Sequence, residues 1–220
     1  ARCRRPRRSS RHIRGRRRPE RWVFHENDYG VIDADNEAQG DYLCLRWHGA
    51  RGCGRESLED LRDVDVVVIA VGGGGLLGGV AVAIRESRPR TRIFAVEPRG
   101  SDALGQAMAA GEPVRLTPTS VADGLNAPSA GRLALEIAGR YLEGAVVIDD
   151  ATILSGLRFS IERLKQVVEP AGAAALAAVL TGAIPIRNGD RVVAVLSGGN
   201  VAPDRLGALL AEAVPLAAPL

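Results

Sequence analysis

A run of mostly β-branched residues, VDVVVIAV at 64–71, is the feature that most constrains the fold of this chain. Apart from Asp65 the run has no polar position, whereas a strand with one face in water would alternate apolar and polar residues. Such a run is typical of a strand in a parallel sheet that is covered on both faces. The residues from Leu76 to Ser87 have a helical pattern, so the sequence predicts a strand, a turn and a helix of an α/β domain.

The same alternation of strand and helix continues toward the end of the chain. Further strands are predicted at 91–98, 144–150 and within 191–200, and helices at 101–110, 130–142, from Asp149 or Asp150 to Leu164, at 167–182 and at 202–213. Parallel strands need long crossover connections, which helices supply. The predicted fold is therefore an open, mostly parallel sheet with helices on both faces.

Capping residues support the predicted helix starts. Ser101 is expected to cap the helix at 101–110, and Asp149 or Asp150 is expected to cap the helix after the strand at 144–150. Pro170 falls in the first turn of an alanine-rich helix, where its missing N–H breaks no helical hydrogen bond. Each of these residues predicts a defined point at which a helix begins after a strand or a loop.

Residues 1–55 differ in composition from the rest of the chain. They hold fourteen arginines against seven acidic residues, whereas residues 56–220 hold fifteen basic and nineteen acidic ones. Residues 25–54 show no strand or helix periodicity. We therefore expect a disordered or out-of-frame basic segment at 1–55, followed by a partial α/β domain at 56–220. Without strands from the first part, one edge of the sheet would be left unpaired.

Three explanations of the basic segment stay open, and the simplest is a solvated tail. A frameshift in a GC-rich gene would account for it, since arginine outnumbers lysine 28 to 1 in the whole chain. A flexible arm that neutralises nucleic-acid phosphates would fit the eleven arginines of residues 1–21, although nucleic acid is not the partner that we expect. A metal cluster of Cys44, His48 and Cys53 matches no zinc spacing, so none is assigned.

The stretch at 66–84 carries no charge and is long enough to span a membrane, but we expect it to be folded in the α/β core. It contains six glycines, which suit a strand, a turn and a helix start better than a membrane helix. The chain has three cysteines and no signal-peptide pattern. An odd cysteine count is typical of a reducing compartment, so we expect a cytoplasmic protein.

Four consecutive glycines, Gly72–Gly75, separate the first strand from the helix. Glycine permits positive φ and close approach of a ligand, and a helix start offers unpaired N–H groups to an anion. A tight turn needs fewer glycines, so the loop predicts a phosphate site. Gly73, Gly75 and Gly78 also spell G-x-G-x-x-G, with Glu97 nineteen residues further on. A Rossmann-like NAD-binding module with Glu97 on the ribose is therefore an alternative.

The ends of other predicted elements favour a different ligand. LSGGN at 196–200 places Ser197 at the carboxyl end of a parallel strand, the edge where open α/β sheets bind ligands. Together with GGGGL at 72–76, ADGL at 122–125 and VVEPAGAAALAA at 167–178, in this order, it resembles the C-terminal half of the threonine dehydratase (threonine ammonia-lyase) and serine racemase family. These are pyridoxal-phosphate enzymes of the tryptophan-synthase-β-like fold type II, and the resemblance covers residue 56 to about 213.

This resemblance implies a cofactor and an activity. The cofactor would be pyridoxal 5'-phosphate, with its phosphate on Gly72, Gly73, Gly74, Gly75 and the N–H of Leu76, and its pyridine nitrogen on Ser197. A neutral hydroxyl is a weak partner for a protonated ring, which suits elimination. The implied activity is α,β-elimination of threonine or serine to a 2-oxo acid and ammonia. The implied partner is a small amino-acid substrate. The resemblance leaves a homo-oligomer open for full-length members of the family.

Two features of the family are missing from this sequence: its Schiff-base lysine, and a smaller domain with an S-G-N-H-like loop beside the cofactor ring. The family's Schiff-base lysine lies in an N-terminal S-x-K segment, whereas the one lysine here, Lys165, lies at a helix end. We therefore assign no catalytic residue and expect the chain alone to be inactive. Some members bind a divalent cation at the positions of Glu97, Ser101 and Ala103, but alanine offers no carboxylate, so no metal ligand is assigned.

Overall fold

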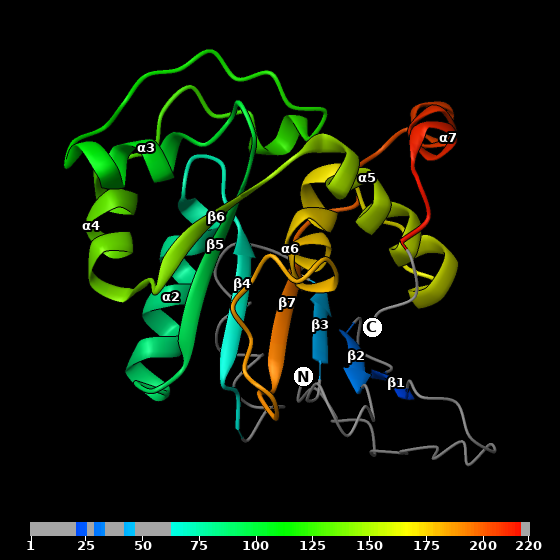
Figure 1. Cartoon of the computed structure of the whole chain (residues 1–220), viewed down its shortest axis with the longest axis horizontal. Helices are drawn as coiled ribbons and strands as arrows, with labels where there is room; N and C mark the ends of the chain where they lie inside the picture. The colour runs from blue at the N-terminus through cyan, green and yellow to red at the C-terminus, as the bar shows by residue number, and fades with distance from the viewer. Residues whose placement is uncertain (1–20, 26–28, 34–41, 47–62, 217–220) are drawn as a thin grey trace, which may run out of the picture.

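The computed structural model describes residues 21–25, 29–33, 42–46 and 63–216, and Figure 1 shows their arrangement. The strands are β1 (Arg21–His25), β2 (Tyr29–Asp33), β3 (Tyr42–Arg46), β4 (Val66–Ala70), β5 (Arg92–Pro98), β6 (Gly144–Ile148) and β7 (Val192–Leu196). The helices are α2 (Gly75–Ser87), α3 (Ala103–Ala110), α4 (Arg132–Tyr141), α5 (Asp150–Phe159), α6 (Pro170–Leu180) and α7 (Pro203–Glu212). A 3-10 turn, η1 (Asp123–Leu125), and a π-helical turn, η2 (Ser160–Leu164), complete the described elements.

The strands form one sheet in the order β1-β2-β3-β7-β4-β5-β6. The five strands from β3 to β6 in this order pair in parallel, and β1 and β2 add an antiparallel end. The predicted open, mostly parallel sheet is therefore confirmed. Because β4 and β7 are parallel neighbours, their carboxyl ends lie at the same edge although 125 residues separate Gly72 from Ser197.

Alternate residues of β4 face two different helical layers. Val66, Val68 and Ala70 belong to the core formed with α5, α6 and part of α7. The intervening residues, Val67 and Ile69, belong to the core formed with α2, α3 and α4. Every residue of β4 is buried, as expected for a strand that is covered on both faces. The run at 66–84 is thus a core strand followed by α2, and no helix in the described part of the chain has the length and apolarity to cross a membrane.

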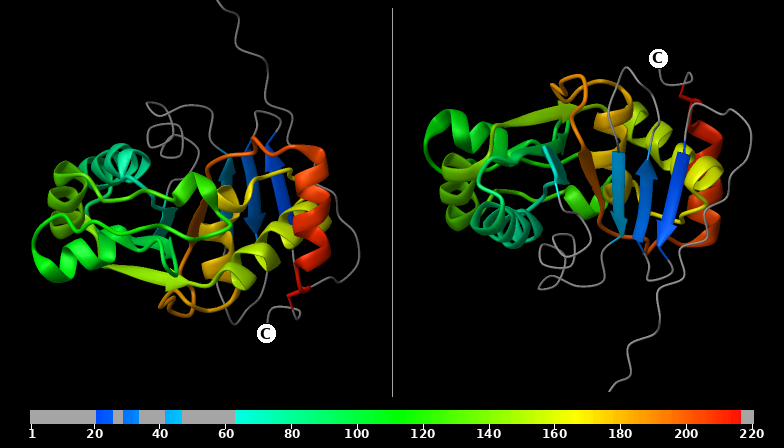
Figure 2. Two further views of the ribbon diagram at one scale, coloured as in Figure 1. Left: turned by 90° about the horizontal axis from the view of Figure 1, so that it is seen from above. Right: turned by 90° about the horizontal axis from the view of Figure 1, so that it is seen from below.

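The expectation that residues 25–54 contain no strand is wrong for the parts that the structure describes. Tyr29–Asp33 and Tyr42–Arg46 are strands, and β3 pairs along its whole length with β7. In Figure 2 the blue strands β1–β3 continue the sheet beside the orange β7, so the edge of β7 that we expected to be bare is covered. These strands are as long as β4 and β7, but they lack the uninterrupted β-branched run by which those two were predicted.

Some sequence predictions lie outside the described residues. These are the arginine-rich arm at 1–20, and His48 and Cys53 of the metal hypothesis. The domain boundary at residue 55 stays a prediction.

Two of the three predicted helix starts are confirmed. Asp149 is the N-cap of α5, where its Oδ1 accepts the N–H of Thr152 at 2.8 Å. Pro170 lies in the first turn of α6. Asp150, the other capping candidate, instead accepts hydrogen bonds from the hydroxyl of Ser120 at 2.6 Å and the N–H of Val121 at 3.1 Å. It thereby ties the loop before η1 to α5.

The predicted cap at Ser101 is wrong. The N-cap of α3 is Asp102, whose side chain makes no capping hydrogen bond. The hydroxyl of Ser101 donates instead to Oδ1 of Asn126 at 2.6 Å, so it holds the loop of η1. The amides at the start of α3 are satisfied by a more distant acceptor: the carboxylate of Glu97 accepts the N–H groups of Leu104 at 2.8 Å and Gly105 at 2.7 Å. Because the buried carboxylate of Glu97 binds these amides, helix α3 needs no capping hydrogen bond from the residue next to its start.

The cap at Asp149 gives the first testable prediction. The hydrogen bonds from Thr152 lower the pKa of Asp149 from its ordinary value, so the ionised form is the stabilising one. We expect D149A to lower the free energy of unfolding by about 1 kcal/mol at pH 7, measured by urea denaturation. The difference from the wild type should persist above about pH 4 and shrink as the pH falls through the pKa of the folded state. An alanine at the exposed residue Glu112, E112A, should change the free energy of unfolding little. An equal loss in E112A would contradict the capping role of Asp149.

Candidate functional site

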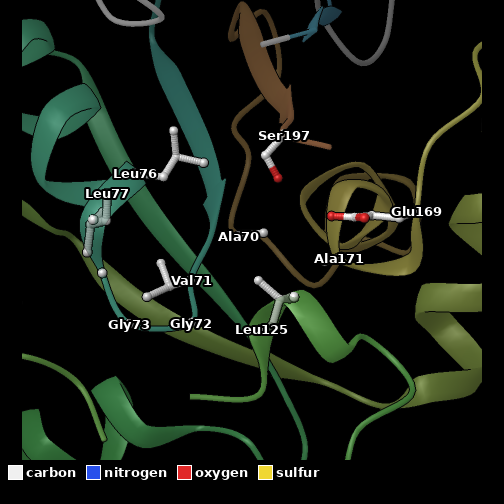
Figure 3. A pocket seen from close by; sticks show the side chains of 13 residues that line it. Ala70, Val71, Gly72, Gly73, Leu76, Leu77, Leu125, Glu169, Ala171 and Ser197 are labelled. Carbon is white, nitrogen blue, oxygen red and sulfur yellow. The ribbon is translucent and has the colours of Figure 1, made fainter. Parts of the chain in front are cut away.

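A pocket of about 240 Å³ opens at the carboxyl ends of β4 and β7 (Figure 3). Its walls come from the end of β4, the tetraglycine loop, the first turn of α2, η1, the start of α6 and the residue after β7. The lining residues are Ala70, Val71, Gly72, Gly73, Gly74, Gly75, Leu76, Leu77, Gly124, Leu125, Glu169, Ala171 and Ser197. All six residues that the sequence assigned to ligand binding therefore line one pocket.

The tetraglycine loop presents bare backbone to this pocket. Gly74 has φ of 91°, and a Cβ there would lie 2.2 Å from the Cβ of Ala134, so the position accepts only glycine. At Gly73 and Gly75, in contrast, a Cβ would meet nothing within 4 Å. The N–H of Gly78 is the first of α2 to bond within the helix, to the carbonyl of Gly74 at 2.9 Å. The N–H groups of the preceding turn remain for a ligand at the positive end of the helix dipole.

Ser197 lies at the opposite side of the pocket. It follows the last residue of β7 and is partly buried. Figure 3 shows its hydroxyl directed into the pocket rather than into the core. A hydroxyl is both donor and acceptor, so Ser197 can bind a ring nitrogen in either protonation state.

The turn η1 forms a third wall and is held rigidly. Oδ1 of Asn126 accepts the N–H of Ser120 at 3.2 Å, and its Nδ2 donates to the carbonyl of Ser120 at 2.7 Å. Backbones also approach closely here, since a Cβ on Gly72 would lie 3.0 Å from the Cα of Leu125, and one on Gly124 would lie 2.9 Å from the Cβ of Ala171. The ADGL motif is therefore the piece that closes the pocket between β4 and α6.

Glu169 is a pocket residue that the sequence analysis did not identify. It is the N-cap of α6, and its N–H donates to the carbonyl of Gly198 at 3.0 Å. Its carboxylate points into the pocket (Figure 3). Burial raises the pKa of Glu169 and the charge of Asp123 raises it further, whereas the N–H of Asn200 and the charge of Arg205 lower it. The signal in the sequence was a carboxylate directly before a proline-initiated helix at the ligand edge of the sheet.

Glu97 does not face the pocket, which argues against a dinucleotide site. Its side chain is fully buried, and both carboxylate oxygens are used by the amides of α3. An acid that binds the ribose must reach the ligand, and this one cannot. The glycines of the fingerprint are present, but the acidic partner is used within the protein.

The same geometry does not fit a cation at this position. Both carboxylate oxygens of Glu97 are bonded to amides of α3, and Ala103 has no carboxylate to offer a cation. Within residues 63–216, no group of three or more His, Cys, Asp or Glu side chains is placed to hold a metal ion.

Lys165 lies away from the pocket. It is exposed, ends η2 in the left-handed conformation with φ of 59°, and its Nζ donates to the carbonyl of Glu162 at 2.7 Å. This agrees with the expected role of a lysine at a helix end.

Comparison with known proteins connects this geometry to a family. A family model described as "Pyridoxal-phosphate dependent enzyme" matches residues 20–198, which is well over half of the chain. The chain belongs to this family. The resemblance expected from the motifs is confirmed, and so is pyridoxal 5'-phosphate as the cofactor of the family. The match begins far before the boundary that we predicted at residue 55.

Individual members of the pyridoxal-phosphate-dependent family include both lyases and racemases. Serine racemase of Arabidopsis thaliana is 38% identical over 151 residues, which cover 66% of this chain and 45% of that protein. L-threonine ammonia-lyase of Thermotoga maritima is 37% identical over 150 residues, which cover 67% of this chain and 37% of that protein. The solved structure of maize serine racemase superimposes with a TM-score of 0.66 at 32% identity, over 74% of this chain and 51% of that one. This chain thus spans less than half the length of the two curated relatives.

Glu97 makes the stability of the domain depend on pH. Burial raises the pKa of Glu97 to about 7, against the hydrogen bonds of Leu104 and Gly105 that favour the ionised form. The unfolded chain therefore loses this proton at lower pH than the folded one, and the free energy of unfolding falls as the pH rises from about 4.3 to 7. We expect this residue to contribute a loss of at most about 3 kcal/mol between pH 5 and 8.

Urea denaturation of the wild type and of E97Q at both pH values tests this prediction. E97Q should remove most of the pH-dependent loss, although the amide can accept only one of the two N–H groups. A difference between the two proteins that is equal at pH 5 and pH 8 would contradict it. E112A, in an exposed loop, serves as the control.

Proposed function

We propose that this chain holds pyridoxal phosphate in the pocket between β4 and β7, as the cofactor-binding half of an ammonia-lyase that acts on threonine or serine. The observation that carries the proposal is the meeting of the tetraglycine loop and Ser197 in one pocket, with open space above Gly73 and Gly75.

The loop would bind the phosphate through backbone N–H groups alone. The N–H groups of Gly73, Gly74, Gly75 and Leu76 surround the start of α2, whose dipole favours an anion. Gly74 supplies the turn, and its fit against Ala134 fixes the direction of those N–H groups. Because no flexible cationic side chain takes part, the affinity rests on a preformed backbone geometry.

Ser197 would orient the ring from the opposite wall. When bound, pyridoxal phosphate supplies an electron sink for bonds at the α-carbon of an amino acid. A serine hydroxyl is neutral and does not hold the ring nitrogen protonated as a carboxylate would. This moderates the electron sink and suits loss of a β-hydroxyl group, which is the elimination that we propose.

The alternative of an NAD-binding module has less support. It shares the glycines but needs Glu97 at the ligand, and this carboxylate is enclosed by the start of α3.

We also propose a cytoplasmic setting for the protein, which the odd number of cysteines supports.

Binding measurements separate the two cofactors. We expect pyridoxal phosphate to bind the wild-type chain in equilibrium dialysis, and NAD to show no binding at the same concentration. G73A places a methyl group in the open space of the pocket without backbone strain, so it should weaken pyridoxal-phosphate binding at least about tenfold while leaving the melting temperature nearly unchanged. G139A is the matched control, because Gly139 also has open space and no positive φ but lies on α4 outside the pocket. Binding of NAD that is lost in G73A would support the alternative.

A further prediction concerns turnover by this chain alone. Its single lysine is Lys165, which is bonded to Glu162 outside the pocket, so we propose that the 220-residue chain carries no amine that could attach the cofactor or remove the α-proton. Incubation with pyridoxal phosphate and L-threonine or L-serine should yield no 2-oxo acid in a coupled dehydrogenase assay. Production of 2-oxo acid above a protein-free control would contradict the proposed inactivity.

A further inference from the structure

Glu169 is the only ionisable side chain among the thirteen residues that line the pocket. The rest of the lining consists of glycine backbone, small apolar side chains and one hydroxyl. A phosphorylated ligand therefore meets one charged side chain in this pocket, and that charge has the same sign as its own. The backbone N–H groups offset the phosphate charge, but they do not neutralise a second anion nearby.

The position of Glu169 is fixed from two directions. Its N–H donates to the carbonyl of Gly198 at 3.0 Å, and its carboxylate accepts the N–H of Asn200. The fit is close, since a Cβ on Gly198 would lie 2.4 Å from Oε1 of Glu169. Glu169 thus binds both a carbonyl and an N–H group of the turn that begins with Ser197. The conformation of this turn determines where the Ser197 hydroxyl points.

We propose that Glu169 is a positioning residue that braces the Ser197 turn, and that its ionisation weakens the binding of a phosphorylated ring; this inference rests on the proposed function. In its neutral form Glu169 keeps the hydrogen bond from Asn200 through its carbonyl oxygen and adds no charge to the pocket. In its ionised form it adds a negative charge to a pocket whose ligand carries a net negative charge of its own. The pocket thus binds its ligand more tightly at the acidic end of the range.

The groups that face Glu169 predict how its ionisation can be moved. Asp123 of η1 favours the neutral form, and Arg205 of α7 favours the ionised form. These two residues form an ion pair with each other, from Nη1 of Arg205 to Oδ2 of Asp123 at 2.8 Å. Burial adds to the effect of Asp123 and raises the pKa of Glu169 above its ordinary range.

The test measures the dissociation constant of pyridoxine 5'-phosphate, which has the same ring and phosphate without the reactive aldehyde, between pH 5 and 8.5. We expect E169Q and the wild type to bind equally at the acidic end, and E169Q to bind about three- to tenfold more tightly at the basic end. The titration of the free ligand cancels in this ratio because both proteins bind the same ligand. E162Q, at an exposed acid of η2 outside the pocket, should follow the wild type at every pH.

Two further variants distinguish a charge effect from a merely structural one. D123N should lower the pH at which the ratio of the two dissociation constants changes, because it removes a negative charge near Glu169. R205Q should raise that pH, because it removes a positive charge. A structural role alone would shift neither. If the wild type binds the ligand but the ratio to E169Q is constant with pH, this inference falls and the proposed function stands. If the wild type binds neither this ligand nor pyridoxal phosphate at any pH, both fall.

Discussion

The parallel pairing of β4 with β7 is the constraint on which the rest of this structure depends. Val66, Val67 and Val68 pair with Val192, Val193 and Ala194, and all are buried. At the amino ends of these strands, Oδ2 of Asp65 accepts the N–H of Arg191 at 2.9 Å and its Nε at 3.0 Å, so the register is fixed where the strands begin. A shift of one residue would turn every buried side chain to the other helical layer. With the register fixed, the tetraglycine loop and Ser197 must meet at the opposite end.

The parts of the fold that the sequence predicted are those whose signals are local. The valine run of β4 predicted burial on both faces, and Pro170 predicted the start of α6. Ser197 was found because a serine at the end of a parallel strand lies at the ligand edge whatever the neighbouring strands are. The strands β1–β3 escaped prediction because their stabilisation is non-local: β3 has a place in the sheet because β7, encoded about 150 residues later, offers it an edge.

Glu97 and Glu169 show why a motif does not determine a carboxylate's role. Both glutamates come near a proline and close to a helix start, and both are shielded enough for burial to raise their pKa values. The carboxylate of Glu97 reaches the amides of the next helix, α3, and is enclosed by them. At Glu169 the helix start that follows contains Pro170 and has no side-chain cap, so the carboxylate turns to Asn200 and the pocket. The sequence spacing is similar in the two cases, but tertiary packing decides which donors each carboxylate binds.

A pocket that binds an anion with backbone amides depends on rigidity more than on charge. A lysine or arginine can follow a displaced phosphate, whereas the amides at the start of α2 are fixed by the close fit of Gly74 against Ala134 of α4 and of Gly72 against η1. The network of Ser120, Asn126 and Asp150 holds η1 in turn. These contacts tie the tetraglycine end of the pocket to α4 and α5, while Glu169 ties the Ser197 end to α6 and the turn after β7. One end is therefore held from both helical layers and the other from the layer of α6, and the β4–β7 pairing joins the two ends.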